Sequence, residues 1–367
     1  MHSNTTVLVT GGAGFIGCAL SQRLARSFDR WVAVDSLHPQ IHPDRIRPAG
    51  LADRAELIIA DISETATWDT VLADIHPDIV IHLAAETGTA QSLDDASRHA
   101  EVNVLGTTRM LDGFTRQDIV PERILLSSSR AVYGEGRWKD RDSGAIRYPG
   151  QRGHSQLAAA AWDFPGLVAV PATAAENTPA PTSVYGATKL AQEQIVSAWV
   201  GARDSELCAL RLQNVYGPGQ SLINSYTGIV SLFSQLARAG KSIPVYEDGG
   251  IVRDFVFIDD VVTAFAAALG LPGCPGVRVF DVGSGTATTV QELAEVIATH
   301  HGAPAPHVTG AFRDGDVRFA ACDIVDTTNE LGWTPAWPLA QGVAALQDWI
   351  DAQLGRSQGV LVSGATS

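Results

Sequence analysis

A glycine-rich turn near the N-terminus constrains the fold of this chain more than any other segment. Residues 10–17 (TGGAGFIG) follow the short apolar run 6–9 and open a stretch of helical periodicity. Glycines at 11, 14 and 17 permit a tight turn, a close approach of the backbone to a pyrophosphate, and close packing of helix on strand. The turn therefore predicts a β-α-β unit that binds a dinucleotide. The residues expected to contact it here are Gly11, Gly14, Phe15, Ile16 and Gly17.

The pattern around this turn predicts the fold class. Short apolar runs at 31–34, 56–59, 79–82 and 123–126 alternate with segments of helical periodicity near 15–28, 65–76 and 97–116. Continuous apolar strands separated by helices are typical of a parallel sheet that is covered on both faces. We therefore predict an α/β fold, a Rossmann-type doubly wound parallel sheet with a smaller C-terminal α/β domain.

Changes of pattern along the chain predict its division. We expect a dinucleotide-binding domain over residues 1–213, a second domain formed mainly by 214–354, and a frayed, flexible tail over 355–367. The first domain contains an insertion at about residues 136–182 that is rich in Gly, Pro and Ala. Structureless segments of that length are uncommon inside compact domains, so we expect a lid or a disordered insertion there.

Charge and composition exclude several classes of partner. The 367 residues include 40 Asp and Glu against 26 Lys and Arg, a formal charge of -14, which disfavours nucleic acid and anionic membranes as partners. No apolar run approaches the length of a membrane span, and the N-terminus lacks the pattern of a signal peptide. Four scattered cysteines suggest neither a disulfide framework nor a zinc site. We expect a cytoplasmic protein without a bound metal.

Asp35 indicates which dinucleotide is bound. It lies at the end of the second predicted strand, where a carboxylate can accept hydrogen bonds from the adenosine ribose hydroxyls. No Arg or Lys follows in Ser36-Leu37 to neutralise a 2′-phosphate, so NAD is favoured over NADP. Asp61 follows the third strand and is expected near the adenine, although a solvated loop acid or helix cap is an equally simple interpretation. The other residues expected along the cofactor are Ile62, Leu83, Ala84 and Ala85.

A hydroxyl, a tyrosine and a lysine predict the chemistry. The strand ending at 126 continues into Ser127, Ser128 and Ser129, at the sheet edge where ligands bind in this architecture. Tyr185 and Lys189 are one helical turn apart, so a neighbouring ammonium can lower the pKa of the phenol. Such a Tyr can take a proton from a substrate hydroxyl while hydride leaves the same carbon, with Ser129 hydrogen-bonded to the reacting oxygen. Taken alone, the Tyr–Lys spacing is usually only a pair on a helix surface.

In combination, these motifs resemble the extended short-chain dehydrogenases/reductases, specifically the NAD-dependent nucleotide-sugar epimerase/dehydratase family. The resemblance spans about residues 6–352 and implies that NAD binds the Rossmann domain, a nucleotide sugar binds the C-terminal domain, and the reaction occurs between them. It also implies that Asn103, Ser127, Tyr185 and Lys189 contact the cofactor. The matching positions are 10–17, Asp35, 82–85, Asn103, 127–134, 185–189, 211–218 and 253–260.

The resemblance further implies which residues bind the substrate. Arg253 and Arg313 match arginines that contact the diphosphate, where a guanidinium can pair with phosphate through two hydrogen bonds. Asn214 matches a residue that contacts the diphosphate or the sugar. The alternative for either arginine is a surface salt bridge, for example between Arg253 and Asp254.

The residues after the active-site hydroxyl discriminate between reactions. The 4,6-dehydratases of this family carry an Asp-Glu pair there, whereas this chain has Arg130-Ala131. Neither side chain can serve as a carboxyl acid or base at neutral pH, so dehydration by that route is disfavoured. The reaction that remains is oxidation at C4, followed by rotation of the keto sugar and return of the hydride to its other face. This is a 4-epimerase reaction that regenerates NAD in every cycle.

A finer resemblance concerns the sugar. Residues 86–92, 129–136 and 213–227 resemble the 4-epimerases that act on dTDP-deoxysugars such as dTDP-L-rhamnose. It implies that Thr87, Gln91, Ser129 and Arg130 face the sugar. The alternatives are a UDP-sugar 4-epimerase, a 4-ketosugar reductase, a dehydratase, a decarboxylase, or an NAD-responsive binding protein without activity.

The family commonly dimerises through two helices of each subunit, here near 97–116 and 186–200, so the resemblance implies a homodimer. Apolar positions on these helices can serve that contact or the core equally well. They are Val102, Leu105, Met110, Ile195 and Trp199.

Overall fold

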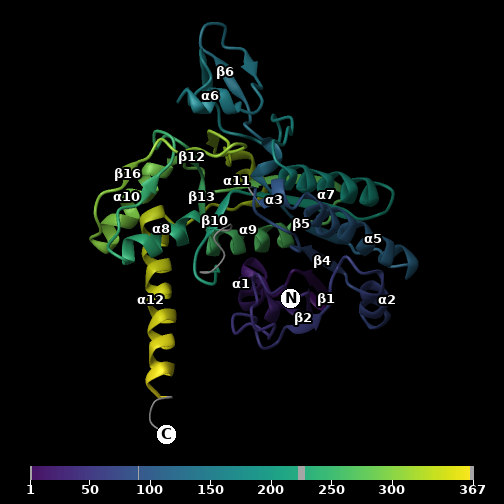
Figure 1. Cartoon of the computed structure of the whole chain (residues 1–367). Helices are drawn as coiled ribbons and strands as arrows, with labels where there is room; N and C mark the ends of the chain where they lie inside the picture. Colours follow the sequence, from purple (N-terminus) through teal and green to yellow (C-terminus); the bar gives the residue numbers. More distant parts are fainter. Residues whose placement is uncertain (1, 90, 222–227, 364–367) are drawn as a thin grey trace.

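A seven-stranded, entirely parallel sheet forms the centre of the molecule (Figure 1). The computed structural model describes residues 2–89, 91–221 and 228–363. The strand order β14-β9-β5-β4-β1-β2-β3 reverses direction between β1 and β4, as in a doubly wound sheet, which confirms the predicted fold class. The strands are β1 (His2–Thr10), β2 (Phe28–Asp35), β3 (Glu56–Ile59), β4 (Ile79–His82), β5 (Arg123–Ser129), β9 (Glu206–Leu212) and β14 (Gly276–Val282).

Helices cover both faces of this sheet. In β1, Val7 and Val9 enter one core cluster and Leu8 enters the other, because successive side chains of a strand point to opposite faces. The first cluster contains residues of α1 and α9, and the second contains residues of α2, α5 and α7. These helices are α1 (Phe15–Leu24), α2 (Thr65–Asp74), α5 (Gly106–Arg116), α7 (Val184–Gly201) and α9 (Ile258–Gly270), with the short helices η1 (Ala25–Ser27), α3 (Gln91–Asp94) and η3 (Arg130–Tyr133) between them.

The helix predicted near 97–116 contains a local irregularity. Its first turn is α4 (Ala96–His99), its last part is α5, and a π-helical segment, η2 (Ala100–Leu105), joins them. Such widened turns occur often at functional sites. Here the segment carries Asn103, which is fully buried.

The chain after residue 213 contributes to two cores. β14 completes the central sheet beside β9, and α9 packs on α1, so part of this segment belongs to the Rossmann layers. The rest surrounds a third core cluster that includes Phe233, Leu293 and Leu346. The remaining elements are β10 (Asn214–Tyr216), α8 (Ile229–Arg238), β11 (Pro244–Val245), β12 (Val252–Arg253), β13 (Phe255–Phe257), β15 (Thr288–Thr289), α10 (Val290–His301), β16 (His307–Val308), β17 (Phe319–Ala320), α11 (Val325–Leu331) and α12 (Leu339–Ser363).

The insertion over residues 136–182 is structured, so the alternative of a disordered insertion is wrong, whereas its role as a lid stays a prediction. β6 (Trp138–Asp140) pairs antiparallel with β7 (Ile146–Arg147) and β8 (Leu167–Ala169), and α6 (His154–Ala158) lies between β7 and β8 in the chain. Trp138 is buried against Phe164, with ring centroids 4.9 Å apart, and gives this small sheet its own apolar contact. Figure 1 shows β6 and α6 projecting from the body of the molecule.

The predicted tail also differs from expectation. α12 continues as a helix as far as Ser363 and extends away from the body, and residues 364–367 lie outside the described part of the chain (Figure 1). Within the described residues, no helix combines the length and the apolar character needed to cross a membrane.

Candidate active site

The glycine turn forms a backbone cradle above the end of β1. Gly11 has φ +65°, and a Cβ atom built there would lie 2.7 Å from the backbone nitrogen of Ala84. A Cβ on Gly17 would lie 2.6 Å from the carbonyl oxygen of Gly12, so α1 packs closely on the turn. Gly14 is the N-cap of α1, and Phe15, Ile16 and Gly17 form its first turn. A helix N-terminus behind a turn without side chains fits the pyrophosphate of a dinucleotide.

Asp35 lies beside this turn at the end of β2. One carboxylate oxygen accepts a hydrogen bond from Ala13 N at 3.0 Å and the other from Leu37 N at 2.9 Å. The carboxylate is thus held in a fixed position next to the cradle, which fits a partner for ribose hydroxyls.

Asp61 and Ile62 have structural roles in the described chain. One oxygen of Asp61 accepts from Ser63 N at 2.8 Å and from Ser63 Oγ at 2.7 Å, the geometry of a loop acid that caps its own turn. The side chain of Ile62 is buried in the core with Trp68 and Gly106. Contact of either residue with the cofactor stays a prediction.

The loop after β4 is held over the cradle by Asn103. Leu83 N donates to Thr10 O at 3.0 Å, and the loop continues through Ala84 and Ala85. Asn103 accepts from Glu86 N at 2.7 Å and donates to Thr188 Oγ1 at 2.9 Å. Asn103 therefore ties this loop to α7, a role that the sequence did not predict.

Ser129 and Tyr185 meet at the carboxyl end of the sheet. Ser129 ends β5, and Tyr185 lies in the first turn of α7, where Ser183 caps the helix by accepting from Gly186 N at 3.0 Å. Burial raises the pKa of Tyr185, while a hydrogen bond from Ser129 and the positive charge of Arg130 act in the opposite direction. Ser127 lies two residues before Ser129 in β5 and is half-buried.

Lys189 is buried one turn further along α7. Its burial lowers the pKa of the ammonium to about 7, which the carboxylate of Glu193 partly counteracts. His82 at the end of β4 is fully buried as well, and burial together with the charge of Lys189 lowers the pKa of its imidazole to about 3. His82 is therefore neutral at physiological pH.

Arg130 connects this pair to the C-terminal segment. Its Nε donates to Asn214 Oδ1 at 3.0 Å, and burial together with the charge of Arg253 lowers the pKa of its guanidinium to about 9. A small cavity lies beside Arg130, with Asp316 contributing to its wall. The other lining residues are Thr89, Ala131, Gly134, Thr182, Ser183, Gly315 and Val317.

The two predicted diphosphate-binding arginines have different surroundings. Arg253 is buried, donates to Val317 O at 2.9 Å and pairs with Asp316 Oδ1 at 2.5 Å. It is therefore not a surface residue and does not pair with Asp254. Arg313 is exposed, with its guanidinium 5.0 Å from the ring centroid of Tyr246.

The residues expected around the sugar are only partly brought together. Gln91 is half-buried and accepts from Gln40 Nε2 at 3.3 Å, and Thr87 is exposed on the loop after β4. Positions 90 and 222–227, which belong to the predicted sugar-recognition segments, lie outside the described residues.

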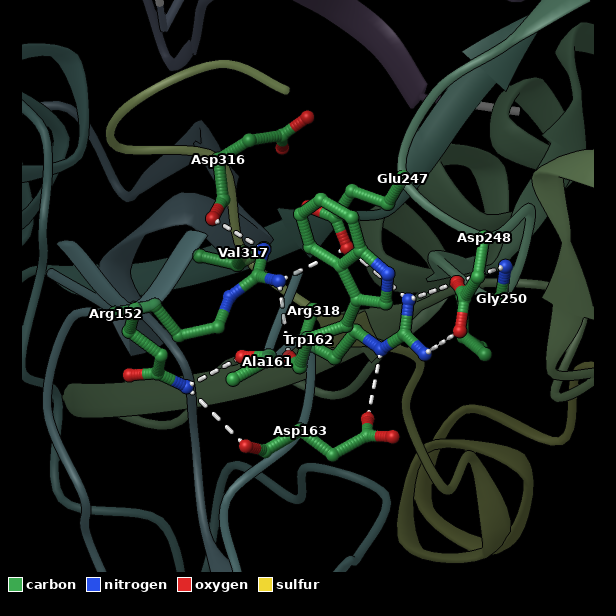
Figure 2. A network of polar contacts seen from close by, with 12 residues as sticks. Arg152, Ala161, Trp162, Asp163, Glu247, Asp248, Gly250, Asp316, Val317 and Arg318 are labelled. Atoms are coloured by element: carbon green, nitrogen blue, oxygen red, sulfur yellow. Dashed lines mark hydrogen bonds and ion pairs between the residues drawn. The ribbon is translucent and has the colours of Figure 1, made fainter. Parts of the chain in front are cut away.

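A buried network of charges joins the insertion to the C-terminal segment (Figure 2). Arg152, fully buried, pairs with Glu135 at 3.2 Å and with Glu247 at 2.9 Å, and donates to Asp316 O at 2.9 Å. Arg318 pairs with Glu247 at 3.0 Å. Its further partners are Asp163 and Asp248.

The sequence did not predict this network, because residues 136–182 show no apolar periodicity that would indicate which of their side chains are buried. Gln192, Thr107 and Glu193, which surround Lys189, were also missed. A signal existed for Gln192 and Glu193, because residues three and four positions after Lys189 share its helix face. Across the ranges that the structure describes, no group of His, Cys, Asp or Glu side chains gathers so as to hold a metal ion.

The sheet, the cradle with Asp35, and the Ser129–Tyr185–Lys189 set together define an NAD-binding enzyme of the short-chain dehydrogenase/reductase class. The model of the NAD dependent epimerase/dehydratase family matches residues 7–156 and 164–283. The chain belongs to this family, and it is an epimerase with NAD as its cofactor.

Individual relatives agree with this assignment. The chain is 58% identical over 350 residues to the dTDP-L-rhamnose 4-epimerase of Burkholderia thailandensis, covering 95% of this chain and 96% of that protein. It is 33% identical to a UDP-glucose 4-epimerase of Mycolicibacterium smegmatis, covering 92% and 96%.

Solved structures resemble it over nearly their whole length. The UDP-glucose 4-epimerase of Thermotoga maritima with UDP-glucose has a TM-score of 0.78 at 26% identity, covering 95% of this chain and 100% of that chain. MoeE5 in complex with UDP-glucose and NAD has a TM-score of 0.74 at 28% identity, covering 95% and 99%.

Proposed function

We propose that this protein is an NAD-dependent nucleotide-sugar 4-epimerase that interconverts dTDP-L-rhamnose and its C4 epimer. The observation that carries the reaction type is Ser129 against Tyr185, with Lys189 on the same helix and Arg130-Ala131 in place of an acid pair. The similarity to a dTDP-L-rhamnose 4-epimerase over nearly the whole chain supports the choice of sugar.

The glycine turn and Asp35 would hold NAD, which when bound supplies the hydride acceptor and donor for C4. Tyr185 takes the proton of the C4 hydroxyl as the carbon is oxidised and returns it after the keto sugar has turned over. The Ser129 hydroxyl donates to the phenol oxygen and so stabilises its deprotonated form. The ammonium of Lys189 favours the same form by its charge.

Arg253 and Arg313 are proposed to bind the diphosphate. Arg253 is paired with Asp316 in the structure, so the substrate phosphate must take over its outer N–H groups from that carboxylate. Asn214 and Arg130 already form a hydrogen-bonded pair and would contact the sugar end of the substrate. Thr87 and Gln91 approach it from the other side in this proposal.

The division of the chain, its assembly and its location complete the proposal. Residues 1–213 would bind NAD and 214–354 would mainly bind the nucleotide sugar, in the cytoplasm. Two subunits would pair through the helices near 97–116 and 186–200, with Leu105 exposed for the contact. Met110 is fully buried in the core and would not take part. Light scattering on the purified protein tests for the dimer.

A product assay tests the activity. Purified protein is incubated with dTDP-L-rhamnose without added NADH, and we expect the C4 epimer by NMR. Tyr185→Phe should keep its fold and NAD but lose about 100-fold or more in turnover, because only the proton-transferring hydroxyl is removed. Accumulation of NADH together with a keto sugar would contradict an epimerase. Conversion of UDP-sugars alone would contradict the choice of substrate.

A further inference from the structure

A hydrogen-bonded row of uncharged side chains begins at Lys189 with Gln192 and Thr107, and the carboxylate of Glu193 also lies near the ammonium. Lys189 Nζ donates to Gln192 Oε1 at 2.5 Å, and Gln192 Nε2 donates to Thr107 Oγ1 at 2.8 Å. Thr107 Oγ1 in turn donates to Asn103 O at 2.6 Å. Gln192, Thr107 and Asn103 are fully buried, so each polar atom that is left without a partner here would be costly.

This arrangement fixes the direction of the Gln192 amide. The hydroxyl hydrogen of Thr107 is used on Asn103 O, so Thr107 can only accept from Gln192. The opposite end of the amide faces an ammonium, which can only donate. In the reversed orientation the amide NH₂ group would face the ammonium of Lys189. The amide oxygen would face Thr107 Oγ1, whose hydrogen is already donated to Asn103 O.

The network continues to the glycine turn through His82. His82 Nδ1 is 2.6 Å from Thr10 Oγ1, and its Nε2 is 2.9 Å from Thr107 Oγ1. Thr10 Oγ1 also accepts from Ala84 N at 3.3 Å. His82 Nε2 is in addition 3.1 Å from Gln192 Nε2, so the imidazole contacts both Thr107 and the amide. Thr10 precedes Gly11, and a Cβ on Gly11 would collide with the backbone of Ala84.

We propose that Gln192 is a positioning residue for Lys189, and that Thr107 and His82 hold the amide in the direction that presents its oxygen to the ammonium. One N–H of the ammonium is committed to Gln192, which leaves the other two for the cofactor and Tyr185. The same row ends at the backbone of the cradle, so the lysine and the NAD-binding turn form one rigid unit.

The activity assay of this proposal rests on the proposed function. The charged and titratable groups near Lys189 and Tyr185 must be the same in the variants that are compared. Glu193 on α7 and His82 from β4 face Lys189, and Arg130 and the ring of His99 from α4 face Tyr185. Gln192→Met, Thr107→Val and Gln194→Met leave all of these groups in place, whereas Gln192→Glu adds a carboxylate.

The test compares Gln192→Met, Gln192→Glu and Thr107→Val with Gln194→Met, an exposed glutamine on the same helix. Measured are kcat, KM and the pH dependence of kcat, together with an ultraviolet titration of the tyrosine in the NAD-loaded protein, from which the Tyr185→Phe spectrum is subtracted. For Gln192→Met we expect the titration of Tyr185 to move up by about one pH unit and kcat at neutral pH to fall about tenfold, with KM little changed. In Thr107→Val we also expect the titration of Tyr185 to move up and kcat to fall.

Gln192→Glu keeps an oxygen for the ammonium but sets a second oxygen against Thr107 Oγ1 and adds a buried charge, so kcat should fall in this variant as well. Gln194→Met should match wild type. A wild-type pH profile in Gln192→Met would overturn the proposal, and so would a lower melting temperature without any shift of the profile. If the wild-type protein converts none of the sugars while the Tyr185 titration still shifts in Gln192→Met, the proposed function fails and the positioning role stands.

Discussion

The row of buried side chains that runs from Lys189 through Gln192 and Thr107 to His82 is made of neutral groups, whereas the polar side chains between the insertion and the C-terminal segment are charged. The first region joins Thr10, His82, Thr107 and Gln192 around a single ammonium. The second, shown in Figure 2, packs Arg152 and Arg318 among carboxylates. Both have a buried centre, but the first is specified by directional hydrogen bonds and the second by ion pairs.

The difference follows from what each region must do. A neutral row is satisfied by directional hydrogen bonds, so it can fix the orientation of one lysine even with the carboxylate of Glu193 nearby. A charged interface holds two parts of the chain together only while every charge keeps its partner, because an unpaired buried charge is costly. We therefore expect changes near Lys189 to act on the reaction, and changes at the interface to act on stability and substrate binding.

The largest effect is expected at the interface. Arg152→Met leaves Glu135 and Glu247 buried without their shared partner and should lower the free energy of unfolding by about 3–5 kcal/mol. Urea unfolding measures it, and Arg147→Met, at an exposed position of the same insertion, is the control. A loss below about 1 kcal/mol would show that the charged interface contributes no more than a surface ion pair.

Arg253 lies where the charged interface meets the proposed substrate site. Arg253→Ala should weaken binding of the nucleotide sugar by about 2–3 kcal/mol, because charge-assisted hydrogen bonds to phosphate are lost. Arg253→Lys keeps the charge but not the planar fork and should lie between the variant and wild type. Isothermal titration with dTDP measures both. Unchanged affinity in Arg253→Ala would leave this arginine a purely structural partner of Asp316.

The neutral region should respond to acid through His82. Its pKa in the folded protein is about 3, against about 6.5 when exposed, so the unfolded chain binds the proton first as the pH falls. The neutral ring of His82 therefore makes its full contribution to the free energy of unfolding above about pH 6.5. As the pH falls from 6.5 to 5, about 2 kcal/mol of that free energy is lost. His82→Gln should lack this part of the acid destabilisation, whereas exposed His76→Gln should keep it. Identical pH dependence in all three proteins would mean that His82 is not buried as a neutral ring.

The smallest effect is expected at Asp35. Asp35→Ala removes the expected acceptor for the ribose hydroxyls and should weaken NAD binding by about 1–1.5 kcal/mol, roughly tenfold. Titration of NAD-free protein measures it, with Asp44→Ala in the exposed loop beyond as the control. If the two variants bind NAD equally, Asp35 serves only to hold Ala13 N and Leu37 N.

The two regions also differ in how far the sequence predicted them. The strands and helices that carry Asp35, Ser129, Tyr185 and Lys189 were predicted because apolar periodicity and glycine spacing are local properties. The internal structure of the insertion was not predicted, because its small sheet is built from short strands around Trp138 and from contacts with distant residues such as Glu247. Likewise, β14 and α9 join the central sheet and its core although they follow residue 213.

By itself, the sequence determined the doubly wound sheet, the glycine turn and the candidate set Ser129, Tyr185 and Lys189, since each depends on residue type at a fixed spacing along one strand, turn or helix. Only the tertiary structure decided that Arg253 pairs with Asp316, that Arg152 is buried, and that Gln192 holds Lys189. These partners lie on separate elements or require knowledge of which helix face is buried. Burial determines what a polar side chain must bind, and burial is a property of the whole fold.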